Sequence, residues 1–499
     1  MHFWAPRHIL EQGEIILETL GLMIGGKDRA ATDDATFVRR NPITNELATK
    51  AAAATVDDAI AAVDAAAAAF PKWSQSTPAE RRKVLFKAAD ILIEKMPLFV
   101  EAMAAEIGAT AGWAGFNVTL AADMLREAGA MTTQITGEII PSNRPGSMAM
   151  AVRQAAGVVL SMAPWNAPVI LGVRSIAMPI ACGNTVVMKT SEICPRTHRL
   201  IIDALCEAEL PAGVLNAISN APDDAPAIVE ALIAQPAVRR INFTGSTRVG
   251  RIIAELAGRH LKPTLMELGG KAPLIVLDDA DIDAAVAAAA FGAYMNQGQI
   301  CMATERIVVD ESIADEFVAA LAVKAKSLKA GNPLEGQAPL GSVVDATAAQ
   351  RIEHIVKDAV SKGATLLAGG SIEGTLVSAI LLDNVTPSMK VYKEESFGPV
   401  VTIARVKSVD EAVAIANDTE YGLSSAVFGK DTVRAMAVAR RIESGICHIN
   451  GPTVHDEAQM PFGGVKASGY GRFGGKAAIQ EFTELRWITV QDGPIHYPI

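Results

Sequence analysis

Short apolar runs alternate with amphipathic stretches along most of this chain. The clearest runs are GVVLSMA, NTVVMK, GVLNAIS and RINFTG, which begin at residues 157, 184, 213 and 240. Each is followed by a stretch with helical periodicity, such as HRLIIDALCEAE or TRVGRIIAELAG. Strands that alternate with helices in this way are typical of a parallel sheet covered on both faces. A second series begins at TLMELGGKAPLIVLDDAD and runs to about residue 450, so we expect two doubly wound domains.

Two further segments have a different pattern. Residues 135–154 carry short alternating stretches around a Pro/Gly turn, which predicts a hairpin, and FTELRWITVQ near the C-terminus alternates like an edge strand. Exposed strands at two separated points suggest a small sheet that is completed by another subunit. The predicted fold class is therefore α/β, with two doubly wound parallel-sheet domains and a small β arm.

Composition and charge exclude several classes of protein. Half of the 499 residues are apolar and a fifth are charged, as in ordinary globular proteins. The formal net charge of −10 disfavours nucleic acid as a partner. The five cysteines are scattered and no pair has the CxxC spacing, so neither a metal site nor a disulfide framework is indicated, and free thiols point to the cytoplasm.

No membrane or export segment is expected. The N-terminal residues MHFWAPRHILEQGEIILETL are interrupted by charges and do not resemble a signal peptide. Residues 154–173 carry no charge and are long enough to span a bilayer. Pro164 and Pro168 bracket Asn166 at the centre of this stretch, however, and would break a membrane helix. A buried strand, a loop and a buried helix are predicted instead.

Two stretches are candidates for binding phosphate and ribose. FTGSTRVGRI, residues 243–252, spaces its glycines like a Walker A loop but has Arg251 and Ile252 in place of Lys and Ser/Thr. What remains is a strand, a Gly245-Ser246 turn and the start of a helix. These elements either bind a diphosphate through backbone N–H groups or form an ordinary strand-to-helix turn. VVMKTSE ends a strand with Lys189, Ser191 and Glu192, which suit ribose hydroxyls or form an ordinary helix start. Because a carboxylate repels a 2′-phosphate, Glu192 favours NAD over NADP.

Two reactive groups stand in apolar surroundings. Glu267, in MELGGKAP, is either a paired or capping carboxylate or a base of raised pKa. Cys301, in NQGQICMATERI, is either inert packing or a nucleophile, and no histidine stands beside it. Gly298 and Ala303 are expected to leave room for ligands around its sulfur.

Together these stretches resemble the aldehyde dehydrogenase superfamily. The motifs that carry the resemblance, in chain order, are APWNAP, MKTSE, NFTGSTRVG, MELGGK, GQICM, EESFGP and PFGGVKASGYGR. The resemblance runs from about residue 21 to the C-terminus. It implies an NAD-binding domain of residues 1–134 and 155–265, a catalytic domain of residues 266–479, and an arm of residues 135–154 and 480–499 that joins subunits in a homodimer or homotetramer.

The resemblance also implies a mechanism. Cys301 is the nucleophile that attacks the aldehyde carbon, and Asn166 together with the backbone N–H of Cys301 holds the oxyanion. Glu267 activates the thiol or the water that hydrolyses the thioester. The implied cofactor-binding residues are Trp165, Lys189, Ser191, Glu192, Gly245, Ser246, Leu268, Glu395 and Phe397.

The residues expected to contact the substrate differ from those of many relatives. Arg174 stands where those that oxidise small aliphatic aldehydes often have an aromatic residue. A cation in an apolar tunnel needs a partner, either a phenolate, hydroxyl or carboxyl group of the substrate or an internal salt bridge. Trp113 and Phe462 are expected to provide flat walls for a ring. These stretches and the terminal IHYPI resemble bacterial salicylaldehyde, vanillin and benzaldehyde dehydrogenases, so an aromatic aldehyde is the expected substrate.

Other departures and alternatives remain open. SNAPDDAP follows a strand where the family usually has glycines near the adenine, and Phe473 stands where many relatives have a proton-relaying glutamate. Broad-specificity or aliphatic aldehyde oxidation, acyl transfer to coenzyme A, a cysteine hydrolase and a non-catalytic binding protein are the alternatives. The presence of Glu267 argues against acyl transfer, because acylating relatives generally lack that base.

Overall fold

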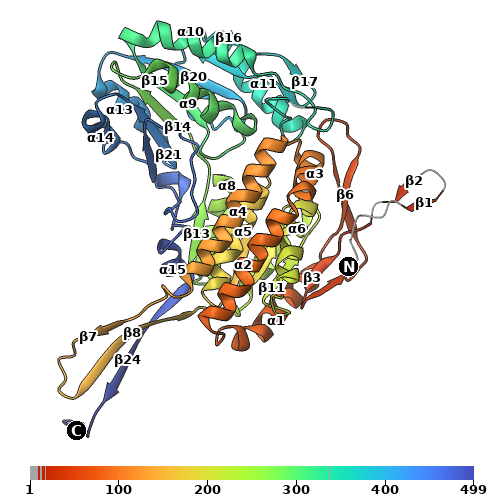
Figure 1. Cartoon of the computed structure of the whole chain (residues 1–499), viewed down its shortest axis with the longest axis vertical. Coiled ribbons are helices and arrows are strands. Elements are labelled where there is room, and N and C mark those ends of the chain that lie inside the picture. Colours follow the sequence, from red (N-terminus) through yellow and green to blue (C-terminus); the bar gives the residue numbers. More distant parts are fainter. Residues whose placement is uncertain (1–8, 12–13, 17, 337) are drawn as a thin grey trace.

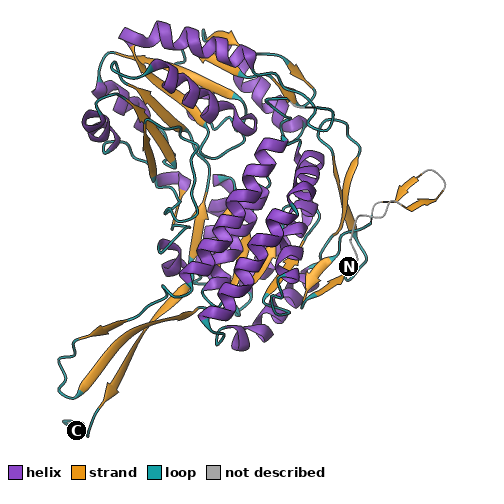
Figure 2. Ribbon diagram, in the orientation of Figure 1, coloured by secondary structure: helices purple, strands orange, loops and turns teal. Residues whose placement is uncertain are grey.

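The computed structural model describes residues 9–11, 14–16, 18–336 and 338–499. Near the N-terminus, β1 (Ile9–Glu11) and β2 (Glu14–Ile16) form an antiparallel pair. The remaining elements make two large sheets with helices around them and an arm that extends away from the body (Figures 1 and 2).

The first sheet has eight strands in the order β23-β13-β12-β9-β10-β11-β3-β4. From β13 to β11 every neighbouring pair is parallel, whereas β23, β3 and β4 are antiparallel additions. The strands are β3 (Leu22–Ile24), β4 (Lys27–Arg29), β9 (Val158–Met162), β10 (Thr185–Lys189), β11 (Leu215–Ile218), β12 (Val238–Thr244), β13 (Thr264–Glu267) and β23 (Gly469–Tyr470).

Helices cover both faces of this sheet, as the alternating strand pattern predicts. Val158 and Leu160 of β9 pack in one cluster with residues of α1, α7 and α8, whereas Val159 packs with residues of α2, α4, α5 and α6. The helices are α1 (Val56–Trp73), α2 (Pro78–Glu94), α3 (Met96–Ile107), α4 (Ala111–Met131), α5 (Pro168–Ala181), α6 (Pro195–Glu207), α7 (Ala225–Ala234) and α8 (Thr247–Arg259). The side pair β5 (Thr36–Arg40) and β6 (Leu47–Ala52) precedes α1.

The second sheet has seven strands in the order β16-β19-β20-β15-β14-β21-β22, all parallel except β16. Its strands are β14 (Ala272–Val276), β15 (Thr304–Asp310), β16 (Thr365–Ala368), β19 (Ile380–Asp383), β20 (Val400–Val406), β21 (Ser424–Phe428) and β22 (Ile446–Ile449). Its helices are α9 (Ile282–Tyr294), α10 (Glu311–Ser327), α11 (Ala346–Ser361), α12 (Lys390–Lys393), α13 (Val409–Asn417) and α14 (Thr432–Ala439), and a small pair, β17 (Ile372–Glu373) and β18 (Leu376–Val377), lies beside it.

One expected boundary is wrong. We expected the second series to begin with TLMELGGK, at a boundary of residues 265 and 266. The structure instead pairs β13 with β12, with Thr244 opposite Glu267, so this segment completes the first sheet. Gly269 and Gly270 then carry the chain across to β14. Glu267 therefore ends a strand of one sheet while facing residues of the other.

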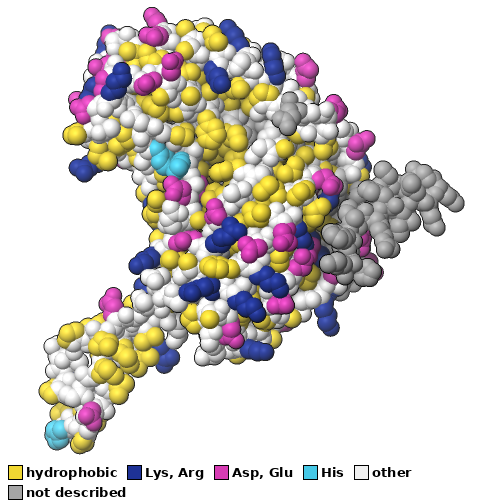
Figure 3. Space-filling model, viewed as in Figure 1, with side chains coloured by type: hydrophobic (Ala, Val, Ile, Leu, Met, Phe, Trp, Pro, Cys, Tyr) yellow, Lys and Arg dark blue, Asp and Glu magenta, His cyan; other side chains and the backbone are white. Residues whose placement is uncertain are grey.

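The arm is a three-stranded antiparallel sheet. β8 (Ser147–Ala155) lies between β7 (Glu138–Ile140) and β24 (Thr483–Gln491), with α15 (Ala477–Glu481) just before β24. Residues more than three hundred positions apart in the sequence thus lie side by side. Side chains of Ile139, Leu485 and Trp487 are strongly exposed, and Figure 3 shows apolar side chains gathered along the arm.

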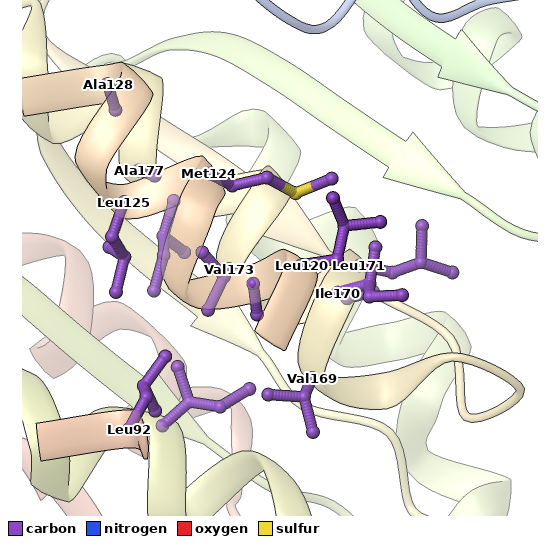
Figure 4. Packing of buried hydrophobic residues seen from close by; sticks show 14 of the residues in the cluster. Leu92, Leu120, Met124, Leu125, Ala128, Val169, Ile170, Leu171, Val173 and Ala177 are labelled. Atoms are coloured by element: carbon purple, nitrogen blue, oxygen red, sulfur yellow. The ribbon is translucent and has the colours of Figure 1, made fainter. Parts of the chain in front are cut away.

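The packing of α4 against α5 sets the position of the loop that precedes α5. Buried aliphatic side chains from both helices interlock, among them Leu120, Leu125, Val169 and Val173 (Figure 4). Because α5 begins at Pro168, this packing fixes Asn166 two residues earlier. Among the described residues, no helix combines the length and the apolar character that crossing a bilayer requires.

Candidate active site

The thiol of Cys301 lies at the end of a loop with an unusual backbone. Asn296, Gln297 and Gly298 all have positive φ, of 49°, 56° and 68°. Such a run is unfavourable for residues with side chains, so it persists only where the surroundings hold it. The side chain of Gln297 does so, donating to the Ser342 carbonyl at 2.9 Å and accepting from the Gly341 N–H at 2.8 Å.

Gly298 has a different role from the one expected. A Cβ at this position would lie 2.1 Å from the carbonyl oxygen of Gly398, so the glycine permits the close approach of two backbones. Gly270 likewise permits a close backbone approach, because a Cβ there would lie 2.1 Å from the Cys301 carbonyl oxygen. Both contacts depend on segments distant in sequence.

The structure places a carboxylate beside the thiol. Glu267 Oε2 lies 3.9 Å from Cys301 Sγ, and the Glu267 side chain is fully buried. Its Oε1 has no hydrogen-bond partner among the residues that the structure describes. Burial raises the pKa of the Glu267 carboxyl to about 8, and burial together with the nearby Glu267 charge raises the pKa of the Cys301 thiol. The pair is therefore poised to exchange a proton.

A cavity of about 310 Å³ opens at the sulfur. It collects eight of the residues predicted from the sequence, namely Trp165, Asn166, Gly245, Ser246, Leu268, Cys301, Glu395 and Phe397. Pro164, Leu171, Thr244, Gly269 and Arg351 also line it and were missed by the sequence analysis. Pro164, Thr244 and Gly269 lie inside the quoted motifs and next to predicted residues, whereas Leu171 and Arg351 lie outside every motif and had no signal in the sequence.

Asn166 is oriented by its surroundings. The side-chain Nδ2 of Asn166 donates to the Gln299 carbonyl at 2.9 Å. The backbone carbonyl of Asn166 accepts from Trp113 Nε1 at 2.9 Å and from Asn296 Nδ2 at 3.0 Å. One Nδ2 proton is used in this way and the amide lines the cavity, so the second is available to an oxygen atom there. Trp113 thus holds the Asn166 backbone in place, a role that the sequence analysis did not assign to it.

The Glu395–Phe397 segment is held by a buried ion pair. Glu305 lies 2.5 Å from Lys271 Nζ and accepts from the backbone N–H groups of Ser396 and Phe397. Phe397 has a φ of 42°, and its ring makes an edge contact with Trp165. Glu395 Oε1 accepts from the Gly270 N–H at 2.9 Å. The segment is therefore fixed in advance of ligand binding.

Three other predicted residues lie away from this cavity. Lys189 Nζ and Glu192 Oε2 form an ion pair of 2.9 Å at the carboxyl end of β10. Ser191 is buried, and its hydroxyl and N–H are engaged by Ile193 and His198. The Lys189–Glu192 pair is partly exposed, so Lys189 can donate to a hydroxyl group and Glu192 can accept from one. The Ser191 hydroxyl accepts from the Ile193 N–H and can still donate its own proton.

Arg174 and Phe462 come together on another side of the nucleophile. The Arg174 guanidinium lies 4.1 Å from the centre of the Phe462 ring and 6.0 Å from that of Phe473. Arg174 also forms a buried salt bridge with Asp456. The internal salt bridge that the sequence left as an alternative therefore exists. Asp456 was missed, although a buried arginine demands a carboxylate and HDE, residues 455–457, lies close to the PFGG motif.

The lining of the cavity suits a dinucleotide. It is bounded by Gly245 and by Ser246, the N-cap of the thirteen-residue helix α8, so backbone N–H groups at that end suit phosphate oxygens. Trp165, Leu268 and Phe397 provide apolar surface for a ring between these groups and the sulfur. The residues present fit a nicotinamide dinucleotide. Among the described residues, no group of His, Cys, Asp and Glu is arranged to hold a metal ion.

Comparisons with known proteins agree with this geometry. The family model described as "Aldehyde dehydrogenase family" matches residues 29–488. A vanillin dehydrogenase from Pseudomonas fluorescens is 62% identical over 478 residues, which cover 96% of this chain and 99% of that protein. A salicylaldehyde dehydrogenase from Pseudomonas putida is 52% identical over 94% of this chain and 97% of that protein. The crystal structure of a salicylaldehyde dehydrogenase from Pseudomonas putida G7, complexed with salicylaldehyde, superposes with a TM-score of 0.95 and 51% identity, covering 96% of this chain and all of that one.

The raised pKa of Cys301 predicts how the cofactor-free protein reacts with an alkylating agent. Since only the thiolate is nucleophilic, inactivation by iodoacetamide should speed up about tenfold per pH unit between pH 6 and pH 8. The measurement is the rate of loss of activity, with the modified cysteine located by peptide mass spectrometry. A rate independent of pH in this range would show that the thiol is already ionised.

Proposed function

The chain belongs to the aldehyde dehydrogenase family, and from this premise we propose that it oxidises aromatic aldehydes of the vanillin or salicylaldehyde type to carboxylic acids. The observation that carries the proposal is the buried Cys301–Glu267 pair at the floor of a cavity that fits a nicotinamide dinucleotide. The high identity to enzymes named for vanillin and salicylaldehyde supports the aromatic substrate.

The first half of the reaction uses Cys301 and Asn166. The sulfur adds to the aldehyde carbon, and the negative charge that develops on the aldehyde oxygen is stabilised by the free Nδ2 proton of Asn166. A donor of this kind contributes about 3–4 kcal/mol in comparable sites. The proton of the thiol passes to Glu267, whose carboxylate is the nearest acceptor. Hydride leaves the same carbon and a thioester remains on Cys301; a nicotinamide ring held by Trp165, Leu268 and Phe397 would supply the hydride acceptor.

The second half uses Glu267 alone. Glu267 first releases the proton that it took from the thiol, and its Oε1, which has no hydrogen-bond partner among the described residues, then accepts a proton from the water that attacks the thioester. The C–S bond breaks, the carboxylic acid leaves, and the Cys301 thiolate is restored. Because Phe473 is apolar and buried, it takes no part in carrying the proton away. This use of Glu267 distinguishes hydrolysis from transfer of the acyl group to coenzyme A.

For the cofactor, the family uses NAD or NADP, and we propose NAD. Support comes from Glu192, whose carboxylate stands with Lys189 at the carboxyl end of β10. In this arrangement Lys189 donates a hydrogen bond to one ribose hydroxyl, and Glu192 accepts a hydrogen bond from another. Lys189, Ser191, Glu192, Gly245, Ser246, Leu268, Glu395, Phe397 and Trp165 remain the proposed cofactor-binding residues.

We also propose that the arm joins two or four copies of the chain. β7 and β24 are edge strands of the arm sheet, and their exposed apolar side chains would be costly in a monomer. A second copy of the same chain buries this surface with no further partner. We propose that the protein is located in the cytoplasm, because free thiols persist in a reducing compartment. The cysteines at positions 182, 194, 206, 301 and 447 are all free thiols.

The function is tested by NADH formation over a panel of aldehydes. The protein with NAD should oxidise benzaldehyde, salicylaldehyde and vanillin faster, in kcat/KM, than propanal or hexanal, and should not require coenzyme A. Cys301→Ala should abolish NADH formation because no nucleophile remains, while the exposed Cys447→Ala variant serves as a matched control that stays active. Normal NADH formation by Cys301→Ala, or turnover only after addition of coenzyme A, would contradict the proposal.

The role of Glu267 is tested by the pH dependence of turnover. Its pKa of about 8 means that the base form appears as the pH rises through 8, so kcat should increase between pH 6.5 and pH 9. Glu267→Gln should lose about 100-fold or more in kcat and should also lose this pH dependence. A variant that keeps the rise with pH would show that another group is the base.

The choice of cofactor is tested at Glu192. Glu192→Gln keeps the shape of the side chain but removes the charge that opposes a 2′-phosphate, so the preference for NAD over NADP should shrink by about tenfold. The measurement is the ratio of the two kcat/KM values at saturating aldehyde. Glu255→Gln, which removes an exposed carboxylate on α8, is the control. An unchanged ratio in Glu192→Gln would remove Glu192 from the cofactor site.

A further inference from the structure

Only one of the two carboxylate oxygens of Asp456 has a hydrogen-bond partner among the described residues. Its Oδ2 pairs with Arg174, and the two side chains are only 7% and 6% exposed. Its Oδ1 is buried and has no hydrogen-bond partner within the described part of the chain. An unsatisfied buried acceptor is costly, and more so on a charged group, so a donor supplied by a ligand would be favourable here.

Asp456 lies between a surface hollow and the nucleophile. It lines a hollow of about 610 Å³ with Phe116 and Leu120 of α4. Its charge also raises the pKa of both Cys301 and Glu267, so it is close to the reacting groups. The dinucleotide cavity does not include Asp456. Asp456 is therefore near the reacting groups, on a side of them that the dinucleotide cavity does not cover.

The charges around Asp456 determine which substituent it can receive. It faces Arg174 from α5, Glu267 from β13, the Cys301 thiol, and His455 beside it on the same loop. The positive charge of Arg174 is already balanced by Asp456. Arg126, which lines the same hollow, is paired with Asp90 and Asp123, and Arg472 acts on Glu267. Glu127 and Glu457 at the hollow and an ionised Glu267 add further negative charge. A phenolate or carboxylate on the substrate would meet net repulsion, whereas a neutral hydroxyl group can donate to Oδ1.

Resting on the proposed oxidation of aromatic aldehydes, we propose that Asp456 Oδ1 accepts a hydrogen bond from an un-ionised phenolic hydroxyl on the substrate ring. Arg174 holds the carboxylate in position, and its guanidinium packs on Phe462. Asp456 is then a specificity-determining residue that selects hydroxybenzaldehydes over benzaldehydes without a ring hydroxyl. Arg174 acts through Asp456 and does not itself bind a substrate anion.

The first test compares hydroxybenzaldehydes with their methyl ethers in the unaltered enzyme. Methylation keeps the ring and the oxygen but removes the proton that Asp456 would accept. We expect kcat/KM for 2- or 4-hydroxybenzaldehyde to exceed that for the corresponding methoxybenzaldehyde, and that for benzaldehyde, by about 10- to 100-fold in at least one of the two series. Equal values in both series would overturn the inference while leaving aromatic aldehyde oxidation intact. Failure to oxidise any of these aldehydes would instead overturn the proposed function.

The second test alters the carboxylate. Asp456→Asn weakens the acceptor, so the preference for the hydroxyl over the methoxy compound should fall by about tenfold or more. Asp123→Asn, an exposed aspartate of the same hollow, is the matched control and should keep the preference. If Asp456→Asn does not fold because Arg174 is left unpaired, the double variant Arg174→Met with Asp456→Leu replaces the buried pair by apolar groups. A preference that persists in the folded variant would overturn the inference.

The third test needs no variant. The ratio of kcat/KM for a hydroxybenzaldehyde to that for its methyl ether cancels the titration of the enzyme's own groups that affect both substrates. As the pH rises through the pKa of the substrate phenol, the proton donated to Asp456 is lost, and the ratio should fall about tenfold per pH unit. A ratio that rises would show that Arg174 binds the phenolate, and a constant ratio would show that the hydroxyl is not recognised.

Discussion

The placement of Glu267 at the junction of the two sheets is the constraint on which the rest of the site depends. A fully buried carboxylate 3.9 Å from a thiol is costly unless one of the two groups stays protonated. The fold nevertheless fixes Glu267 in this position. Its strand, β13, belongs to the first sheet, and Gly269 and Gly270 lead directly from it into β14 of the second sheet. Glu267 and Cys301 are thus brought together by the crossing of the chain between domains, and their raised pKa values follow from that burial.

The surroundings hold this arrangement through buried polar groups that the hydrophobic pattern does not reveal. Gln297 fixes the strained loop before Cys301, Glu305 fixes the Glu395–Phe397 segment, and Asp456 balances Arg174. In each case a side chain satisfies backbone or side-chain groups from a distant part of the sequence. The site is therefore prepared before ligands arrive, which reduces the reorganisation that catalysis would otherwise require.

The sequence predicted the parallel sheets well because their strands are short apolar runs with helices between them, and local periodicity determines both. It also predicted the arm strands from their alternation. The boundary at residue 266 was wrong because strand pairing is a long-range property: nothing within TLMELGGK tells which sheet its strand joins. Gly298 was misassigned for the same reason, since its neighbour Gly398 lies a hundred residues away. Asp456 was missed because no motif contains it, although the burial of Arg174 required a carboxylate somewhere.

The most direct test of the central claim is to observe the acyl group on Cys301. The Glu267→Gln variant is mixed with NAD and an aromatic aldehyde and quenched in acid at a series of times, long enough for an acylation that is slowed by the loss of the group that accepts the thiol proton. Each sample is analysed by intact and peptide mass spectrometry. If Cys301 is the nucleophile and Glu267 the base for hydrolysis, one acyl group per chain accumulates on the peptide that contains Cys301, together with a burst of about one equivalent of NADH. An NADH burst without an acyl adduct, or an adduct on another cysteine, would contradict this account.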